Sequence, residues 1–220
     1  MTLRALLFDL DGTLADTDPV HLRAWLECLR PYGVKIDREY YRSRISGRLS
    51  SVVARDLLPG LSDEDVDEIV KLKQSRFCEF AANLTKLKGL DKLLSWSKQK
   101  GLRLGLVTNA TRPHAHFMLR KLGLEGFFDA EVLGEETPAG KPDPAPYLIA
   151  LRHLKIAAPL ALAFEDSSSG VRSSVAAGVK TVGIASSQSR DRLLGVGASL
   201  VIEDFRDSQL WELLESGAQK

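Results

Sequence analysis

Short, continuous apolar runs that alternate with helical patterns constrain the fold of this chain more than any other feature. Three of these runs span residues 3–8, 102–107 and 160–164. Runs of this length without polar alternation are typical of parallel strands that are buried on both faces. Weaker candidate strands follow in the same rhythm at Glu131–Leu133, Thr181–Ile184 and Leu200–Ile202. The pattern predicts an α/β fold with a doubly wound, Rossmann-like parallel sheet.

The segments between these runs carry helix signals. Helices are expected over about residues 112–122, 144–154 and 168–177, because Pro or Ser stands near each start and Gly follows two of the ends. The second of them is expected to bury one face made of Tyr147, Leu148, Leu151 and Leu154. A terminal helix packed on the core is predicted from Leu210, Trp211, Leu213 and Leu214.

Residues 16–88 break this rhythm, because they contain no convincing strand. Asp18-Pro19 is a good helix start, with Asp18 as the N-cap, and Ser62 to Asp65 resembles a capping box. About 70 residues of helix are far more than a crossover between two parallel strands needs. We therefore predict that residues 1–15 and 89–220 form an α/β core and that residues 16–88 form an inserted, all-helical cap domain.

Charge and cysteine content exclude several classes of protein. The chain of 220 residues carries 30 Lys and Arg against 29 Asp and Glu, a formal net charge of +1. This balance disfavours non-specific nucleic-acid binding, and the first apolar run is too short for a membrane span or a signal-peptide core. We expect a cytoplasmic monomer without nucleic-acid or membrane partners. Cys28 and Cys78 lie outside any zinc-binding spacing, so buried reduced thiols are expected, with a disulfide as the alternative.

Two carboxylates follow the first run directly, in Phe8-Asp9-Leu10-Asp11-Gly12. Side chains two apart on an extended strand point the same way, so Asp9 and Asp11 should repel and raise at least one pKa. A divalent cation with a preference for oxygen ligands, such as Mg²⁺, would relieve this repulsion. The alternative is that Asp11-Gly12 only forms a tight turn.

Polar residues also follow the other two principal runs or lie in a stiff loop between them. Thr108-Asn109 follows the second run, Lys141 stands before Pro142 in a proline-rich loop, and Glu165-Asp166 ends the third run. Taken singly, these are a helix cap, an exposed lysine and a strand end. Taken together, they lie at the edge of an α/β sheet where ligands bind. Four acids with a single lysine imply that a cation is needed before an anion can bind there.

In order and spacing, these residues resemble the four motifs of the haloacid dehalogenase superfamily over nearly the whole chain. The matching residues are Asp9-x-Asp11-Gly12-Thr13, Thr108-Asn109, Lys141 and Glu165-Asp166. The helical insert after the first motif resembles that family's small cap. The resemblance implies an enzyme that uses Mg²⁺ to transfer a phosphoryl group from a small phosphorylated substrate.

The resemblance also implies a role for each residue. Asp9 is the expected nucleophile, which forms an aspartyl-phosphate, and Asp11 is the expected general acid and then general base. Repulsion from the neighbouring acids is expected to favour the protonated form of Asp11. The expected metal ligands are Asp9, the backbone carbonyl of Asp11, and Asp166, with Glu165 near the metal. The expected phosphate-binding residues are Thr108, Asn109 and Lys141.

Three histidines and one arginine are further candidates. The stretch from Asp16 to Trp25 resembles the start of the cap in the β-phosphoglucomutase-like branch, which includes sugar-phosphate phosphatases. His21 is therefore expected to assist Asp11 by hydrogen bonding, with a surface or core histidine as the alternative. Arg48 could grip an anionic or hydroxylated substrate, or remain solvated. His114 and His116 are predicted to diverge and to lie on the surface, because they stand two apart at a helix start.

Two activities remain open after this comparison. The first is a phosphatase for a small sugar or polyol phosphate, and the alternative is a β-phosphoglucomutase-type mutase. Val107-Thr108-Asn109 resembles the phosphatase form of the second motif, and the loop at residues 47–50 differs from the Ser-Arg-Glu loop of the mutase. The lysine with which the mutase holds its substrate is not identifiable from the sequence. A non-catalytic binding protein is disfavoured, because Asp9 and Lys141 are both intact.

Overall fold

The structure, a computed structural model, describes residues 3–217 and contains one six-stranded sheet. The strand order is β3-β2-β1-β4-β5-β6, and every neighbouring pair is parallel. The strands are β1 (Ala5–Phe8), β2 (Arg103–Thr108), β3 (Ala130–Leu133), β4 (Ala161–Glu165), β5 (Lys180–Ile184) and β6 (Leu200–Ile202). This is the doubly wound arrangement, with the reversal of strand order between β1 and β4. The predicted fold class and strands are confirmed.

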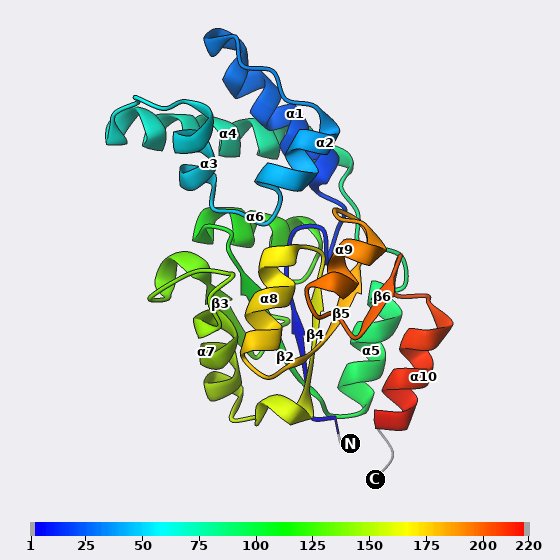
Figure 1. Cartoon of the computed structure of the whole chain (residues 1–220). Coiled ribbons are helices and arrows are strands. Elements are labelled where there is room, and N and C mark those ends of the chain that lie inside the picture. Colours follow the sequence, from blue (N-terminus) through cyan, green and yellow to red (C-terminus); the bar gives the residue numbers. More distant parts are fainter. Residues whose placement is uncertain (1–2, 218–220) are drawn as a thin grey trace.

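Helices cover both faces of the sheet (Figure 1). One face carries α5 (Leu90–Gln99), α6 (Arg112–Lys121) and α10 (Ser208–Gly217), and the other carries α7 (Ala145–Leu154), α8 (Ser168–Ala176) and α9 (Arg190–Gly195). Leu6 and Phe8 of β1 pack toward the first face, whereas Ala5 and Leu7 pack toward the second. Burial on both faces is why this strand is a continuous apolar run.

The predicted helix faces are confirmed with one exception. Tyr147, Leu151 and Leu154 of α7 are buried, but the side chain of Leu148 is 46% exposed and does not belong to the buried face. In the terminal helix α10, Leu210 and Leu214 are fully buried, while Trp211 and Leu213 pack at the margin of the same cluster. The part of the predicted tail beyond residue 217 lies outside the described residues.

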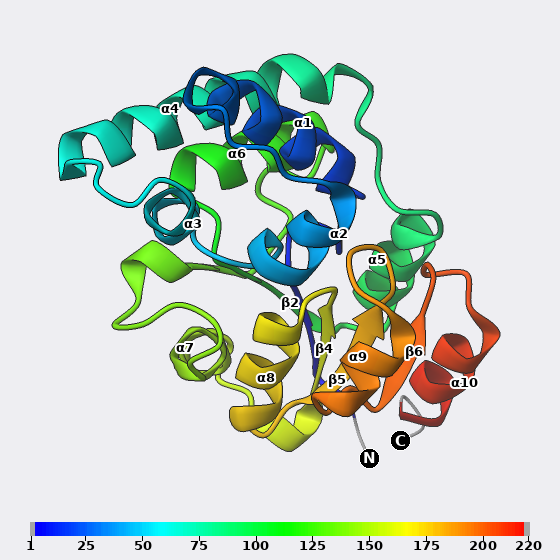
Figure 2. The ribbon, with the colours of Figure 1, turned by 45° about the horizontal axis from the view of Figure 1, so that its top comes forward.

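Between β1 and α5 the chain forms helices and no strand (Figures 1 and 2). These helices are α1 (Asp18–Leu29), α2 (Arg38–Tyr40), α3 (Ser50–Leu57) and α4 (Asp63–Phe80), with a π-helical turn at Tyr41–Ile45. We call them the cap. Their facing side chains form a separate hydrophobic cluster that includes Trp25, Tyr41, Val53, Val66 and Ile69.

The start of α1 differs slightly from the prediction. Asp18 is the first helical residue, and Thr17 occupies the N-cap position without a capping hydrogen bond from its side chain. Pro19 stands in the first turn, where a missing N–H costs nothing. Trp25 and Leu29 of this helix are buried, whereas Leu26 is 40% exposed.

The cap covers the carboxyl end of the sheet, and the chain begins and ends at the opposite end (Figure 1). There the backbone N–H of Leu3 donates to the carbonyl of Gly217. Cap residues touch the core directly at several points. The carbonyl of Gly47 accepts hydrogen bonds from Asn109 Nδ2 and Ser169 Oγ, and Arg42 Nη2 donates to the carbonyl of Ser186. A cavity of about 350 Å³ lies between the two parts.

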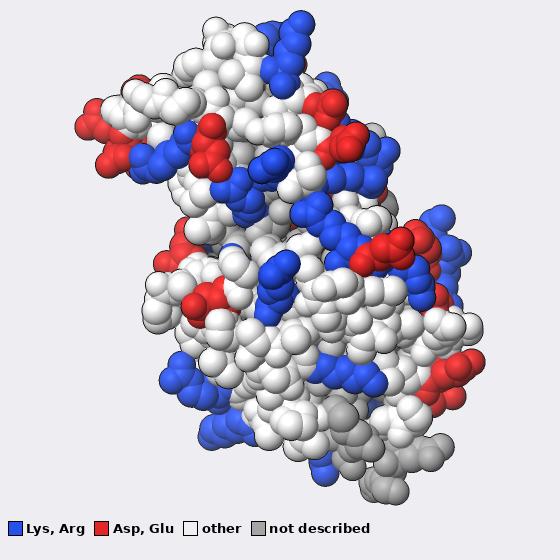
Figure 3. Space-filling view, viewed as in Figure 1, with Lys and Arg blue, Asp and Glu red and all other residues white. Residues whose placement is uncertain are grey.

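The surface charge and the state of the two cysteines agree with the predictions from composition. Lys and Arg are interspersed with Asp and Glu over the face in Figure 3. Among the described residues, no helix combines the length and the apolar character needed to cross a bilayer. Both cysteines are free thiols, as predicted, although only Cys28 is buried and Cys78 is partly exposed.

The helix α4 begins with the predicted capping box. Ser62 Oγ accepts a hydrogen bond from the backbone N–H of Asp65, and the Asp65 carboxylate accepts one from the backbone N–H of Ser62. We expect Ser62→Ala to lower the free energy of unfolding by about 1 kcal/mol, measured by urea denaturation. Ser189→Ala is the matched control, because Ser189 also precedes a helix but makes no capping hydrogen bond with its side chain. Equal losses in the two variants would contradict this assignment.

Candidate active site

Three carboxylates meet where β1 and β4 end. Phe8 pairs with Phe164 in the sheet, so Asp9 and Glu165 leave neighbouring strands side by side, and Asp166 follows. All three residues are buried, and each offers a carboxylate oxygen within 4.8 Å of the others. Burial raises the pKa of Asp9, and burial together with repulsion from Asp9 raises the pKa of Asp166 well above its ordinary value. This is the sheet edge where the strand order reverses and where ligands bind in such folds.

Lys141 partly neutralises this cluster. Its ammonium donates to Asp9 Oδ1 at 2.6 Å, to Glu165 Oε1 at 2.5 Å and to the carbonyl of Val107 at 2.7 Å. The hydroxyl of Tyr147 also donates to Glu165 Oε1, at 2.5 Å. Burial nevertheless raises the pKa of Glu165 to about 7, against the attraction of Lys141. One lysine therefore does not balance three buried carboxylates.

The remaining oxygens of the cluster suit a cation. Glu165 Oε2 is buried and has no hydrogen-bond partner. A set of carboxylate oxygens at one point is the donor chemistry that Mg²⁺ prefers. Gly12 leaves room beside it, because a Cβ at this position would lie 2.0 Å from Asp166 Oδ2 and its φ of +77° favours glycine. The residues present therefore fit a magnesium ion.

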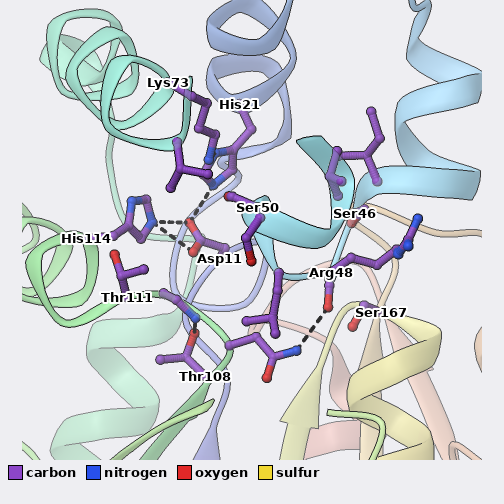
Figure 4. Close-up of a pocket in the computed structure, with 18 of the residues that line it drawn as sticks. Asp11, His21, Ser46, Arg48, Ser50, Lys73, Thr108, Thr111, His114 and Ser167 are labelled. Carbon is purple, nitrogen blue, oxygen red and sulfur yellow. Dashed lines mark hydrogen bonds and ion pairs between the residues drawn. The ribbon is translucent and has the colours of Figure 1, made fainter. Parts of the chain in front are cut away.

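Asp11 stands apart from this cluster, between two histidines (Figure 4). His21 Nε2 lies 3.0 Å from Asp11 Oδ1, and His114 Nε2 lies 2.9 Å from Oδ2 and 3.0 Å from Oδ1. Burial would raise the pKa of Asp11, but the two histidines hold it well below its ordinary value. The expectation that neighbouring acids favour the protonated form of Asp11 is therefore wrong. The sequence shows the acids beside it but not the histidines.

The structure also corrects the prediction for His114. This residue is buried and reaches Asp11, because the face of α6 that carries it turns toward the cap rather than toward solvent. His116, two positions further along, is exposed as predicted. The divergence of the two rings is thus correct, and only the surface placement of His114 is wrong.

Cap helix α4 holds both histidines through two consecutive residues that the sequence analysis missed. Lys73 Nζ lies 2.9 Å from His21 Nδ1, and Gln74 Oε1 lies 2.9 Å from His114 Nδ1. Burial lowers the pKa of Lys73 to about 8, and burial together with Lys73 lowers that of His21 to about 3. Because Lys73 donates to Nδ1, the hydrogen of the neutral His21 ring is on Nε2, where it is donated to Asp11. This arrangement makes Asp11 and the two histidines a hydrogen-bonded group rather than a set of metal ligands.

Thr108 and Asn109 lie at the same edge, after β2. Thr108 is buried, and its Oγ1 accepts from the backbone N–H of Ala110. The side chain of Asn109 accepts from the backbone N–H of Lys141 at 2.9 Å and donates to the carbonyls of Lys141 and Gly47. Asn109 thereby connects the Lys141 loop to the cap.

Arg48 lines the cavity, but its charged end is turned away from Asp11 (Figure 4). Its guanidinium donates to Asp56 Oδ2 at 2.6 Å and to the carbonyl of Arg44. The other cap residues around the cavity are both polar and apolar, and include Ser46, Ser50, Ser51, Gln74, Trp25, Tyr41, Ile45 and Leu49. The cavity therefore offers hydroxyl groups and apolar surface above an acidic floor.

These observations define an α/β protein with an acidic, lysine-containing site at the switch point of a doubly wound sheet, sheltered by helices. The sequence matches the haloacid dehalogenase-like hydrolase family over residues 6–184. The chain belongs to this family.

The chain is also similar to individual proteins of this family. The phosphorylated carbohydrates phosphatase of Thermotoga maritima is 32% identical and is matched over 82% of this chain and 84% of its own length. Protein CbbY of Rhodobacter capsulatus is 34% identical, over 83% of this chain and 85% of its own. The crystal structure of CbbY from Rhodobacter sphaeroides with xylulose-1,5-bisphosphate superposes with a TM-score of 0.81 at 28% identity, covering 94% of this chain and 96% of that one.

These similarities confirm the predicted superfamily and the branch that contains sugar-phosphate phosphatases and β-phosphoglucomutase-like proteins. They also confirm the predicted enzyme class, a phosphoric monoester hydrolase of the haloacid dehalogenase type. The structure brings together every predicted core residue, and it places His21 against Asp11 as expected.

One buried acid of the cap gives the protein a pH dependence of its own. Asp18 lies 4.0 Å from Arg42 Nε, and burial raises its pKa from 3.8 to about 6. Between pH 3.8 and about pH 6, Asp18 stays protonated in the folded protein but is ionised in the unfolded chain. The free energy of unfolding therefore falls as the pH rises over this range, and this contribution to stability is lost as the pH rises through 6. Because Asn cannot ionise, the Asp18→Asn variant does not undergo this loss. We expect its free energy of unfolding, relative to that of the wild type, to rise by up to about 3 kcal/mol between pH 4 and pH 7.

The measurement is urea denaturation of the wild type and the variant at both pH values, with a chelator present. Asp191→Asn is the matched control, because Asp191 also lies in the first turn of a helix but is exposed. A gain that is the same at both pH values, or that Asp191→Asn reproduces, would show that Asp18 does not titrate in this way.

Proposed function

We propose that this enzyme is a Mg²⁺-dependent phosphatase that hydrolyses a small phosphorylated metabolite, a sugar or polyol phosphate, through an aspartyl-phosphate intermediate. The observation that carries the proposal is the placement of Asp9. Its carboxylate lies on the floor of the cavity between Lys141 and Asp166, with Asp11 two residues away. The phosphatase names of the relatives support the same conclusion.

In the proposed reaction, a carboxylate oxygen of Asp9 attacks phosphorus while the bond to the leaving oxygen breaks. The leaving oxygen takes up a proton from the hydrogen-bonded group of Asp11 and its two histidines. Because the pKa of Asp11 is low, a histidine ring supplies this proton through Asp11 as the bond breaks. Asp11 then accepts a proton from the water that attacks the aspartyl-phosphate, which frees Asp9 and releases phosphate. His21 assists Asp11 by the hydrogen bond described above.

The other core residues bind and orient in this proposal. Asp9, the backbone carbonyl of Asp11 and Asp166, with Glu165 nearby, would hold Mg²⁺, which would supply positive charge for the phosphoryl oxygens. Lys141, Thr108 and Asn109 also bind these oxygens. In Asn109 this role falls to the backbone N–H, because the side-chain amide already bonds to Lys141 and Gly47.

The cavity limits the substrate. At about 350 Å³ beneath a docked cap, it suits a small metabolite rather than a phosphorylated protein. The hydroxyl groups of Ser50 and Ser51 suit a hydroxylated carbon chain, and Arg48 stands at the same wall. We further propose that residues 16–88 act as one cap domain on a core of residues 1–15 and 89–220. We also propose a monomeric, cytoplasmic enzyme with no nucleic-acid or membrane partner.

One observation favours a second candidate, a β-phosphoglucomutase-type mutase. Such an enzyme must hold its sugar for a second transfer, and the buried Lys73 provides a cation in the cap wall of the cavity. In the structure, however, this ammonium is hydrogen-bonded to His21. The phosphatase remains the first choice.

The two activities are separated by one assay with the full chain. Phosphate release is measured from a panel of sugar and polyol phosphates with Mg²⁺, beside isomer formation from β-glucose 1-phosphate. We expect phosphate release from at least one compound, loss of this activity in EDTA and recovery with Mg²⁺. Isomer formation without free phosphate would favour the mutase, and activity that is unchanged in EDTA would contradict the metal site.

The nucleophile is tested by Asp9→Asn. Removal of the attacking carboxylate is expected to abolish turnover, while the fold is retained because an amide fits the same space beside Lys141. Circular dichroism and thermal unfolding check the fold. Asp16→Asn, an exposed neighbour, should leave turnover unchanged. Normal turnover in Asp9→Asn would remove Asp9 from the mechanism.

A further inference from the structure

The geometry points to His114 as a second positioning residue for Asp11, held in place by Gln74 of the cap. We propose that this contact keeps the Asp11 carboxylate in the orientation needed for proton transfer, and that it is made only when the cap is docked on the core. The inference rests on the phosphatase proposal, because it concerns the same acid–base group.

His114 is built into the site rather than lying beside it. Its side chain is 4% exposed, and its Nε2 lies within 3.0 Å of both Asp11 oxygens. The ring packs against Phe77 of the cap with a centroid distance of 4.6 Å and lies 5.2 Å from the ring of His21. A buried polar ring with both nitrogens hydrogen-bonded occupies a single orientation.

The contacts of His114 differ from those of His21 in a way that gives it a role of its own. His21 contacts Oδ1 of Asp11 alone and leaves Oδ2 without a partner from its ring. His114 reaches both oxygens, so the two rings together restrain the plane of the carboxylate. The Asp11 side chain is 26% exposed to the cavity, so no packed wall fixes its orientation instead.

The contact also joins the two parts of the molecule. His114 belongs to core helix α6, whereas Gln74 belongs to cap helix α4, and their hydrogen bond of 2.9 Å crosses the boundary between core and cap. Gln74 Nε2 donates to Cys78 Sγ one turn further along α4, which directs the amide oxygen toward His114. Lys73, the preceding residue, acts on the other histidine. Helix α4 therefore contacts both imidazoles, that of His114 across the boundary and that of His21 within the cap.

The test compares steady-state kinetics of three full-length variants on the best substrate of the panel. His114→Leu removes both hydrogen bonds and should lower kcat about 10- to 100-fold while KM changes less than about threefold, because orientation affects the chemical step rather than binding. His114→Gln retains an N–H that can reach Asp11 and should recover most of the loss. Gln74→Met leaves His114 in place without its support and should lower kcat by a smaller factor.

A matched control and a measurement without substrate complete the design. His116→Leu changes an exposed histidine of the same helix and should leave kcat unchanged. The protein has four histidines, so the imidazole nitrogen signals in a ¹⁵N spectrum can be assigned by substitution. The His114 signals should shift in Asp11→Asn and in Gln74→Met, whereas those of His116 should not.

Different experimental results would contradict the proposed function and the proposed role of His114. A wild-type enzyme that is inactive on the whole panel contradicts the proposed function, and the nitrogen signals then still decide whether His114 contacts Asp11. An active wild type whose kcat is unaffected by His114→Leu contradicts only the role of His114. Equal losses in His114→Leu and His114→Gln, or a change confined to KM, would also overturn it.

Discussion

The burial of three carboxylates around one lysine is the constraint on which the rest of this structure depends. The pairing of β1 with β4 places Asp9 beside Glu165, and no rearrangement short of a change of register would separate them. Buried charges without full compensation cost stability. The cost is offset directly beneath the site, where Phe8 stacks on Phe164 at 5.0 Å and both rings contact Phe205. A packed cluster of aromatic rings thus lies directly beneath the buried carboxylates.

The cap completes this site as well as covering it. His21, Lys73 and Gln74 all come from the cap, and each acts on Asp11 directly or through an imidazole. On the other side of the cavity, the side chain of Asn109 bonds to Gly47 of the cap and to the backbone of Lys141. The carbonyl of Gly47 also accepts from Ser169, and a Cβ at this glycine would lie 2.7 Å from Ser167. Cap docking and the order of the catalytic edge are therefore coupled through shared hydrogen bonds.

The sequence predicts the fold and the core of the site well because both depend on local patterns. A strand buried on both faces must be a continuous apolar run, and the residue that follows it must lie at the carboxyl edge. His114, Lys73 and the low pKa of Asp11 depend instead on which helix faces meet across the cavity. Helical spacing shows that His114 and His116 diverge, but not which of them faces the cap. A single lysine in the charged helix α4 carries no signal that distinguishes it from its solvated neighbours.

Two aspartates only two positions apart thus acquire opposite properties from their surroundings. The pKa of Asp9 is raised and that of Asp11 is lowered, and such divergence is how proteins assign different chemical roles to like groups. Asp9 must be ionised to act as a nucleophile. Its burial beside Asp166 disfavours the ionised form, and the attraction of Lys141 alone does not offset this effect. A cation among these oxygens would offset it, so a bound metal would favour the ionised form of Asp9 as well as attract phosphate. With a net charge of +1 the chain has no general attraction for anions, so this local charge must provide it.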